Sequence, residues 1–254
     1  MDVNAKTNDG WAPLRTAVWQ KNECVVKLLL DTGKVDVNTA LDCGSTPLHE
    51  AARTGCVGIV EMLVKNGAYV DSQEDTLQTP LLYAVERGHT DVVKILLEEG
   101  ADANWLWWKE WTIISAWTPL WRAVEKGHAD IVQMLLEKGA DANLRDLSER
   151  TPLLHAVMKD HAKIVKILVD SGKADIRAVD KNGWSPLFWA VKNGSEAIVK
   201  MLLETKKVDI HMEDKISRTA LSVAHESGNQ AIIDMMNAYA HDKRPSHEAS
   251  SSVK

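Results

Sequence analysis

The sequence has little Phe or Tyr, few cysteines and no excess of positive charge. Its 254 residues include one Phe and three Tyr, but ten Trp. Because Trp combines a large apolar ring with one N–H donor, an aromatic content made mostly of Trp is typical of binding surfaces. The formal net charge of −6 provides no basic excess for a nucleic-acid backbone. We therefore expect no nucleic-acid partner.

Sequence signals for membranes, metals and cofactors are also missing. No apolar run reaches the roughly 20 residues of a membrane span, and the N-terminus lacks the basic and apolar regions of a signal peptide. Cys24, Cys43 and Cys56 form no metal-ligand spacing, and neither a Gly-rich phosphate loop nor a nucleophile elbow is present. These absences predict reduced thiols, no metal or cofactor, no membrane partner, and a cytoplasmic location with the nucleus as the alternative.

A repeat of about 33 residues organises the chain. A Pro-Leu pair recurs six times, and Ala220 takes the proline position in a seventh copy. The intervals between neighbouring anchors are 34, 33, 39, 33, 34 and 34 residues. The anchors are Pro13, Pro47, Pro80, Pro119, Pro152, Pro186 and Ala220.

Each copy predicts two short helices and a turn-rich finger. Thr or Ser before the proline is a helix N-cap, and proline is tolerated at the first helical position because an N–H there has no intrahelical partner. A glycine, such as Gly55 or Gly88, ends the first helix. The second helix has apolar residues at helical spacing, as in 92–97. Since one such unit cannot bury its apolar face alone, the units must stack into a solenoid.

The two recurring phrases resemble the ankyrin repeat family. They are clearest as T-P-L-H-E-A at 46–51 and G-H-T-D-V-V-K-I-L-L-E-E-G-A-D-A-N at 88–104. The resemblance implies an all-α solenoid of paired antiparallel helices with hairpin-like fingers and a concave groove. We expect one domain of about seven repeats at 1–240, with a Trp-rich finger insertion at 105–117, and a disordered polar tail at 241–254.

The family pattern places two sets of residues on the groove. The residue two before each proline lies in the finger, and the residue three after it lies on the first helix. Because neighbouring repeats stack at about 10 Å, the first helices are expected to present one row of side chains. That row is Glu50, Tyr83, Arg122, His155 and Trp189, and the helix ends add Trp19, Arg53, Arg87, Lys126, Lys159 and Lys192. The alternative is a mixed polar row that only decorates a solvated groove.

Histidines of the family motif are expected to be structural. The pattern implies that His49, in the T-P-L-H position, binds the backbone of a finger. His89, His128 and His161, in the turn between the helices, are also expected to be structural. Trp121 replaces the motif histidine in the fourth copy, which indicates altered packing beneath that finger.

The 39-residue interval lengthens the finger between the third and fourth copies by six residues. The insertion carries Trp105, Trp107, Trp108 and Trp111. Because large exposed apolar patches mark interaction sites, it predicts an aromatic lid over the groove or a docking site. Packing on its own repeat is the remaining interpretation.

Two functions of different classes fit these residues. The favoured one is a recognition module that binds a protein or peptide in the groove, with the insertion setting specificity. The other is an apolar small-molecule site, or a cofactor-free cyclase or isomerase. In that enzyme His155 or Glu50 would act as acid or base, and Arg122 or Tyr83 would orient a carbonyl. The candidate binding residues are Trp11, Trp19, Trp105, Trp107, Trp108, Trp111, Trp117, Trp121, Trp184, Trp189, Tyr83, Arg122 and His155.

The enzyme hypothesis requires a specific cavity. A closed pocket lined by Trp107, Trp111, Trp121 and Trp189 would favour a small molecule, whereas an open groove would favour a protein partner.

Overall fold

The computed structural model describes residues 2–7, 10–105 and 118–242, and the regular structure of these residues is helical. Beside the helices they contain one isolated bridge, between Glu213 and Thr219. The chain divides into two compact units, Met1–Leu147 and Ser148–Lys254. The boundary between the units lies between the fourth and fifth helix pairs.

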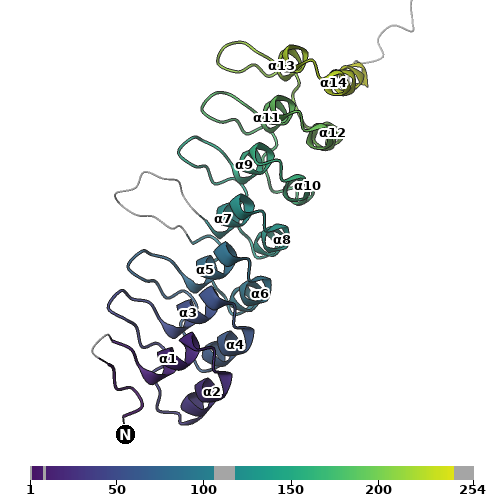
Figure 1. Cartoon of the computed structure of the whole chain (residues 1–254). Helices are drawn as coiled ribbons and strands as arrows, with labels where there is room; N and C mark the ends of the chain where they lie inside the picture. The colour runs from purple at the N-terminus through teal and green to yellow at the C-terminus, as the bar shows by residue number, and fades with distance from the viewer. Residues whose placement is uncertain (1, 8–9, 106–117, 243–254) are drawn as a thin grey trace, which may run out of the picture. The chain divides into compact units, whose positions relative to one another are not determined.

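Unit 1 contains four helix pairs. Consecutive first helices pack on one another, as do consecutive second helices, and the fingers before α3 and α5 project from the side opposite the second helices (Figure 1). The first helices are α1 (Pro13–Trp19), α3 (Pro47–Thr54), α5 (Pro80–Arg87) and α7 (Pro119–Lys126). The second helices are α2 (Glu23–Asp31), α4 (Val57–Lys65), α6 (Thr90–Glu98) and α8 (Ala129–Glu137).

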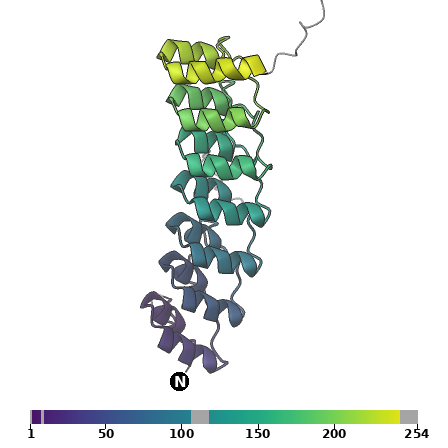
Figure 2. The same cartoon turned by 90° about the vertical axis from the view of Figure 1, so that its right-hand side faces the viewer.

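Unit 2 contains three helix pairs with the same layering, and Figure 2 shows its second helices in front of its first helices. Helix α14 ends at Asp242, two residues beyond the expected end of the repeats at residue 240. The first helices are α9 (Pro152–Met158), α11 (Pro186–Asn193) and α13 (Ala220–Ser227). The second helices are α10 (Ala162–Asp170), α12 (Glu196–Glu204) and α14 (Gln230–Asp242).

The predicted helix starts are confirmed. Proline occupies the first turn of α5 and α7, and the hydroxyls of Thr79 and Thr118 accept hydrogen bonds from the N–H of Leu82 and Trp121. Each cap satisfies a backbone donor that the helix leaves unpaired, which contributes about 1 kcal/mol to stability.

Small first-helix residues and large second-helix residues form the core. Ala51 and Ala84 on first helices are completely buried, as are Leu63 and Leu96 on second helices. Burying each such Leu contributes on the order of 1.5–3 kcal/mol, while the absence of bulk at Ala allows the helices to approach closely.

The Asn of the A-D-A-N segment ties neighbouring repeats together. Asn104 Nδ2 donates to the Gly139 carbonyl at 3.0 Å, and Asn104 Oδ1 accepts from the Asp141 N–H at 2.8 Å. The amide suits this position because it both donates and accepts. Asp71 occupies the same position in the preceding repeat. Its ionised carboxylate can only accept, so it makes only the second of these bonds, from the Asp102 N–H at 3.0 Å.

His89, in the turn between α5 and α6, has the expected structural contact. His89 Nε2 lies 3.2 Å from the Arg53 carbonyl, and the ring packs over Gly55 of the preceding repeat. Gly55 has φ of 72°, and a Cβ added there would lie 2.6 Å from His89 Nδ1. Glycine at this position therefore provides both the left-handed helix end and room for the next histidine.

Candidate functional site: fingers and first helices

Two Trp residues form the centre of an aromatic cluster in unit 2. The ring centroids of Trp184, in a finger, and Trp189, on α11, lie 4.6 Å apart with the planes at 68°. Trp184 also stacks on Phe188, with centroids 5.0 Å apart. Phe188 is 2% exposed, whereas both Trp side chains are only partly buried. The buried Phe188 therefore supports the Trp184 ring, and both Trp side chains retain exposed surface.

Both indole N–H groups of this cluster bind buried carboxylates. Trp184 Nε1 donates to Asp214 Oδ2 and Trp189 Nε1 donates to Asp180 Oδ2, each at 3.0 Å. Burial raises the pKa of Asp214, but hydrogen bonds from Arg218, Ile216 and Trp184 outweigh it and lower the pKa to about 2. The carboxylate stays ionised and fixes the Trp184 ring against the neighbouring finger.

Two cations lie against the same aromatic rings. Lys192 Nζ is 3.9 Å from the Trp184 centroid and 5.2 Å from that of Trp189, within the range of cation–π attraction. Arg218 Cζ is 5.7 Å from the Trp184 centroid, and Arg218 also pairs with Asp214 at 2.9 Å. We call Trp184, Trp189, Lys192 and Arg218 the Trp184 cluster.

A smaller aromatic pair lies at the N-terminal end of unit 1. Trp11, in a finger, and Trp19, at the end of α1, meet edge to face with centroids 6.0 Å apart. Trp19 is 54% exposed, which is unusual for so large an apolar side chain. The Arg15 guanidinium lies 5.2 Å from the Trp11 ring and donates to the Ser45 carbonyl at 2.7 Å.

Arg15 and His49 make the same type of contact in successive repeats. His49 Nε2 lies 3.1 Å from the Gln78 carbonyl, and Arg15 reaches the equivalent finger residue, Ser45. The expected backbone role of His49 is therefore confirmed, and Arg15 preserves it. Arg15 occupies the motif-histidine position of the first copy, and its guanidinium donors were a sequence signal for this contact.

The polar row of unit 1 forms separate pairs. The Glu50 carboxylate binds Arg53 at 2.6 Å, and the Tyr83 hydroxyl donates to Glu74 Oε1 at 2.6 Å. Burial, followed by the bond to Glu74, raises the pKa of Tyr83, so its hydroxyl remains a donor. These contacts account for the positions of the Glu50 and Tyr83 side chains without a catalytic role.

Arg122, the third member, lies between two carboxylates. It binds Glu86 at 2.8 Å and Glu125 at 3.3 Å. The sequence analysis did not name these partners; Arg87 and Lys126, which it placed at the helix ends, directly follow Glu86 and Glu125 in the sequence. Glu86 and Glu125 each lie seven residues after the N-cap of their helix, on the same helix face as Trp19 and Arg53.

Other predicted site residues differ in exposure. His155, on α9 of unit 2, is 5% exposed, and Trp121, on α7, is 3% exposed. Trp121 is therefore buried and offers little surface for a ligand. Trp105 is partly buried, and its Nε1 donates to the Leu77 carbonyl of the preceding finger at 3.1 Å. Four further candidates, Trp107, Trp108, Trp111 and Trp117, lie outside the described residues.

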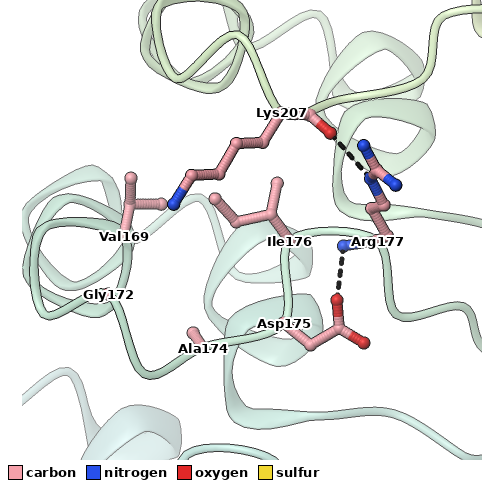
Figure 3. Close-up of a pocket in the computed structure, with 7 residues that line it drawn as sticks. All are labelled: Val169, Gly172, Ala174, Asp175, Ile176, Arg177 and Lys207. Atoms are coloured by element: carbon pink, nitrogen blue, oxygen red, sulfur yellow. Dashed lines mark hydrogen bonds between the residues drawn. The ribbon is translucent and has the colours of Figure 1, made fainter.

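A shallow pocket of about 200 Å³ lies in unit 2, in the turn after α10 (Figure 3). Its lining includes Val169, Ile176 and Lys207, without an aromatic side chain. Arg177 Nε donates to the Lys207 carbonyl at 2.9 Å, in the position where other repeats use Asn. The pocket belongs to the inter-repeat turn and does not provide the Trp-lined cavity that the enzyme hypothesis requires.

The helix pairs, fingers and histidine contacts agree with a family comparison. The family model described as ankyrin repeats (3 copies) matches residues 1–74, 69–146, 138–214 and 174–247. The chain belongs to the ankyrin repeat family. Ankyrin repeat domains generally mediate protein–protein interaction. None of the helices within the described ranges combines the length and apolar character needed to cross a membrane.

Solved ankyrin repeat structures match most of the chain. The ankyrin repeat domain of Bcl-3, a member of the IkappaB protein family, is 29% identical with a TM-score of 0.75, over 91% of this chain and 100% of that one. The human ASB11 ankyrin repeat domain is 26% identical with a TM-score of 0.70, over 89% of this chain and 98% of that one.

Matches to curated proteins are shorter. Neurogenic locus notch homolog protein 1 of Mus musculus is 31% identical over 103 residues, which is 41% of this chain and 4% of the relative. B-cell lymphoma 3 protein homolog of Mus musculus is 32% identical over 99 residues, 37% of this chain and 22% of the relative. The chain thus spans only a small part of the length of these relatives.

Proposed function

We propose that this ankyrin repeat chain is a recognition module that binds a protein partner through its fingers and first helices. The observation that supports this is the placement of Trp: Trp11 and Trp19 in unit 1, and Trp184 and Trp189 in unit 2, each lie in a finger and on a first helix of their own unit and retain exposed surface. Trp is enriched among the few residues that dominate binding energy at interfaces. The pairs therefore serve as anchors for the partner.

The lengthened finger at 105–117 is proposed to set specificity. Trp105 supports this role because its bond to Leu77 ties the start of the insertion to the finger of the third repeat. A partner that lies along the fingers would meet the insertion between the third and fourth repeats. Shortening the finger by six residues, to the usual repeat length, would then change which partner is retained rather than abolish folding.

Affinity capture with the tagged full chain tests this function. Trp19→Ala, Trp184→Ala and Trp189→Ala are each expected to weaken partner binding by about 2 kcal/mol, which is roughly 30-fold in Kd. Tyr69→Ala is the matched control, because Tyr69 is 68% exposed in the turn after α4, away from the fingers and first helices. Far-UV circular dichroism checks that each variant is folded.

Equal capture by all four variants would contradict the proposal. If only Tyr69→Ala loses capture, the interface lies instead at the turns that follow the second helices.

A further inference from the structure

The charges of the Trp184 cluster are separated by depth. Its two acidic neighbours, Asp180 and Asp214, are 5% and 7% exposed and accept the indole N–H groups. Lys192 is exposed, and Arg218 retains about a third of its side-chain surface. The negative charges are thus directed inward and already bonded, while the cations lie at the surface beside the Trp rings.

Lys192 differs from Arg53 and Arg122, two cations of the first helices of unit 1. Arg53 pairs with Glu50, and Arg122 pairs with both Glu86 and Glu125. Lys192 forms no ion pair with a carboxylate of the described residues, and its ammonium is held over Trp184 by cation–π attraction instead. An acidic group brought by a partner would give this ammonium the counter-charge that it lacks.

A partner cation would fit the same place poorly. The face of Trp184 that attracts a cation is already occupied by Lys192 at 3.9 Å. An incoming ammonium would have to displace Lys192 and would meet the charge of Arg218 beside it. Like charges brought together at an interface oppose binding, whereas complementary charges favour it.

We propose that the Trp184 cluster binds an acidic peptide segment, with a Glu or Asp side chain paired to Lys192 and adjacent apolar side chains on Trp184 and Trp189. This inference rests on the proposed recognition function and names the chemistry of the partner at one site. Arg218 assists as the second cation, although Asp214 shares its charge.

Selection from a randomised dodecapeptide library displayed on phage, with the full chain as bait, tests the inference without presuming a sequence. Selected peptides are expected to contain Glu or Asp next to Leu, Ile or an aromatic residue. They are then synthesised with an amidated C-terminus, so that only side-chain carboxylates supply the negative charge. Calorimetric titration is expected to show about tenfold weaker binding when Gln or Asn replaces the acid.

Lys192→Gln is expected to weaken the acidic peptide about tenfold and to leave the Gln or Asn peptide unchanged. Lys200→Gln is the matched control, because Lys200 is exposed on α12 of the same repeat, on the second-helix layer. It is expected to leave both affinities unchanged. Binding of the acidic peptide is also expected to weaken from 50 to 500 mM NaCl, since salt screens exposed ion pairs.

Neutral or basic peptides that bind Lys192→Gln as well as the parent would overturn the acidic assignment. If Trp184→Ala still weakens those peptides, the groove remains the recognition surface and only the inference fails. If neither Trp184→Ala nor Trp189→Ala weakens them, groove recognition at this site fails as well. If no library peptide binds, the inference is overturned. The affinity-capture experiment then tests the proposed function independently.

Discussion

The Lys192 ammonium lies 3.9 Å from the centre of the Trp184 ring, and the Asp214 carboxylate holds the same indole by its N–H. The ring is thus fixed by a cation at its face and by an anion at its edge. This arrangement agrees with the quadrupole of an aromatic ring, whose face is negative and whose edge is positive. A fixed ring costs little conformational entropy on binding, which suits an anchor residue.

Replacing Lys192 by Met is expected to lower the free energy of unfolding by about 0.5–1 kcal/mol, because Met keeps an apolar stem but loses the cation–π contact. Urea unfolding followed by Trp fluorescence measures the change. Lys200→Met provides the control on α12, where the Lys200–Glu204 pair at 4.0 Å is exposed. A Lys192→Met protein as stable as the parent would show that the contact contributes nothing.

Acid is expected to weaken the Trp184 cluster through Asp214. Its pKa of about 2 in the folded chain lies below the ordinary value of 3.8. A carboxyl whose folded pKa is depressed contributes stability that is present above 3.8 and lost as pH falls toward 2. The urea midpoint of the parent should therefore decrease over this range.

The isosteric variant Asp214→Asn removes the titrating group. Its urea midpoint is expected to be lower than the parent's at pH 5, and the difference should shrink as pH falls from 4 to about 2. A difference that stays constant over this range would contradict the assignment of the acid dependence to Asp214.

His49 is expected to make unit 1 sensitive to mildly acidic pH. The Thr46 N–H points at His49 Nδ1 from 3.1 Å, so Nδ1 must accept and Nε2 carries the proton toward the Gln78 carbonyl. Burial lowers the pKa of this imidazole below 6.5 in the folded chain. The unfolded chain then binds the proton more readily, and stability falls as pH decreases below 6.5.

Urea unfolding at pH 7.5 and pH 5 measures this effect. His49→Gln is expected to cost about 1–2 kcal/mol at pH 7.5, because a buried bond to the finger weakens, and to show a smaller decrease between the two pH values. His211→Gln, at an exposed site in unit 2, is the control. A pH dependence that His49→Gln leaves intact would assign the titration to another group.

The helices and their caps could be predicted because they depend on short segments. Proline at the first turn, Thr at its cap and Gly at its end each act within one turn of helix, so Thr79 and Gly55 were correctly assigned from sequence alone. The backbone role of His49 was also predictable from the family motif.

The partners of long side chains could not be predicted in this way. The family phrases placed Arg122 on a first helix, but they did not indicate that its partners are Glu86 and Glu125. A shift of one residue on a helix turns a side chain by about 100°, and the family phrases do not specify the register at the helix end. The boundary between the two units after Leu147 could not be predicted either, because the repeats on both sides of it have similar sequences.

The absence of a side chain at Gly55 leaves room for His89 of the next repeat, and a Gly55 variant measures how much this contributes to stability. Gly55→Ala places a methyl group 2.6 Å from His89 Nδ1 and retains φ of 72°. The left-handed conformation alone costs about 1–2 kcal/mol for Ala. The steric conflict with the histidine is expected to add at least about 1 kcal/mol, since an overpacked neighbour must move. Urea unfolding of the full chain gives the total.

Gly67→Ala separates the two costs. Gly67 lies in the same repeat with φ of 87°, and no atom lies within 4 Å of the added Cβ, so only the backbone cost is expected there. In the double variant Gly55→Ala with His89→Ala, the steric cost should disappear, and the two changes should be less destabilising together than the sum of the single effects. Additive effects would mean that His89 moves aside freely and that the glycine is needed only for its backbone conformation.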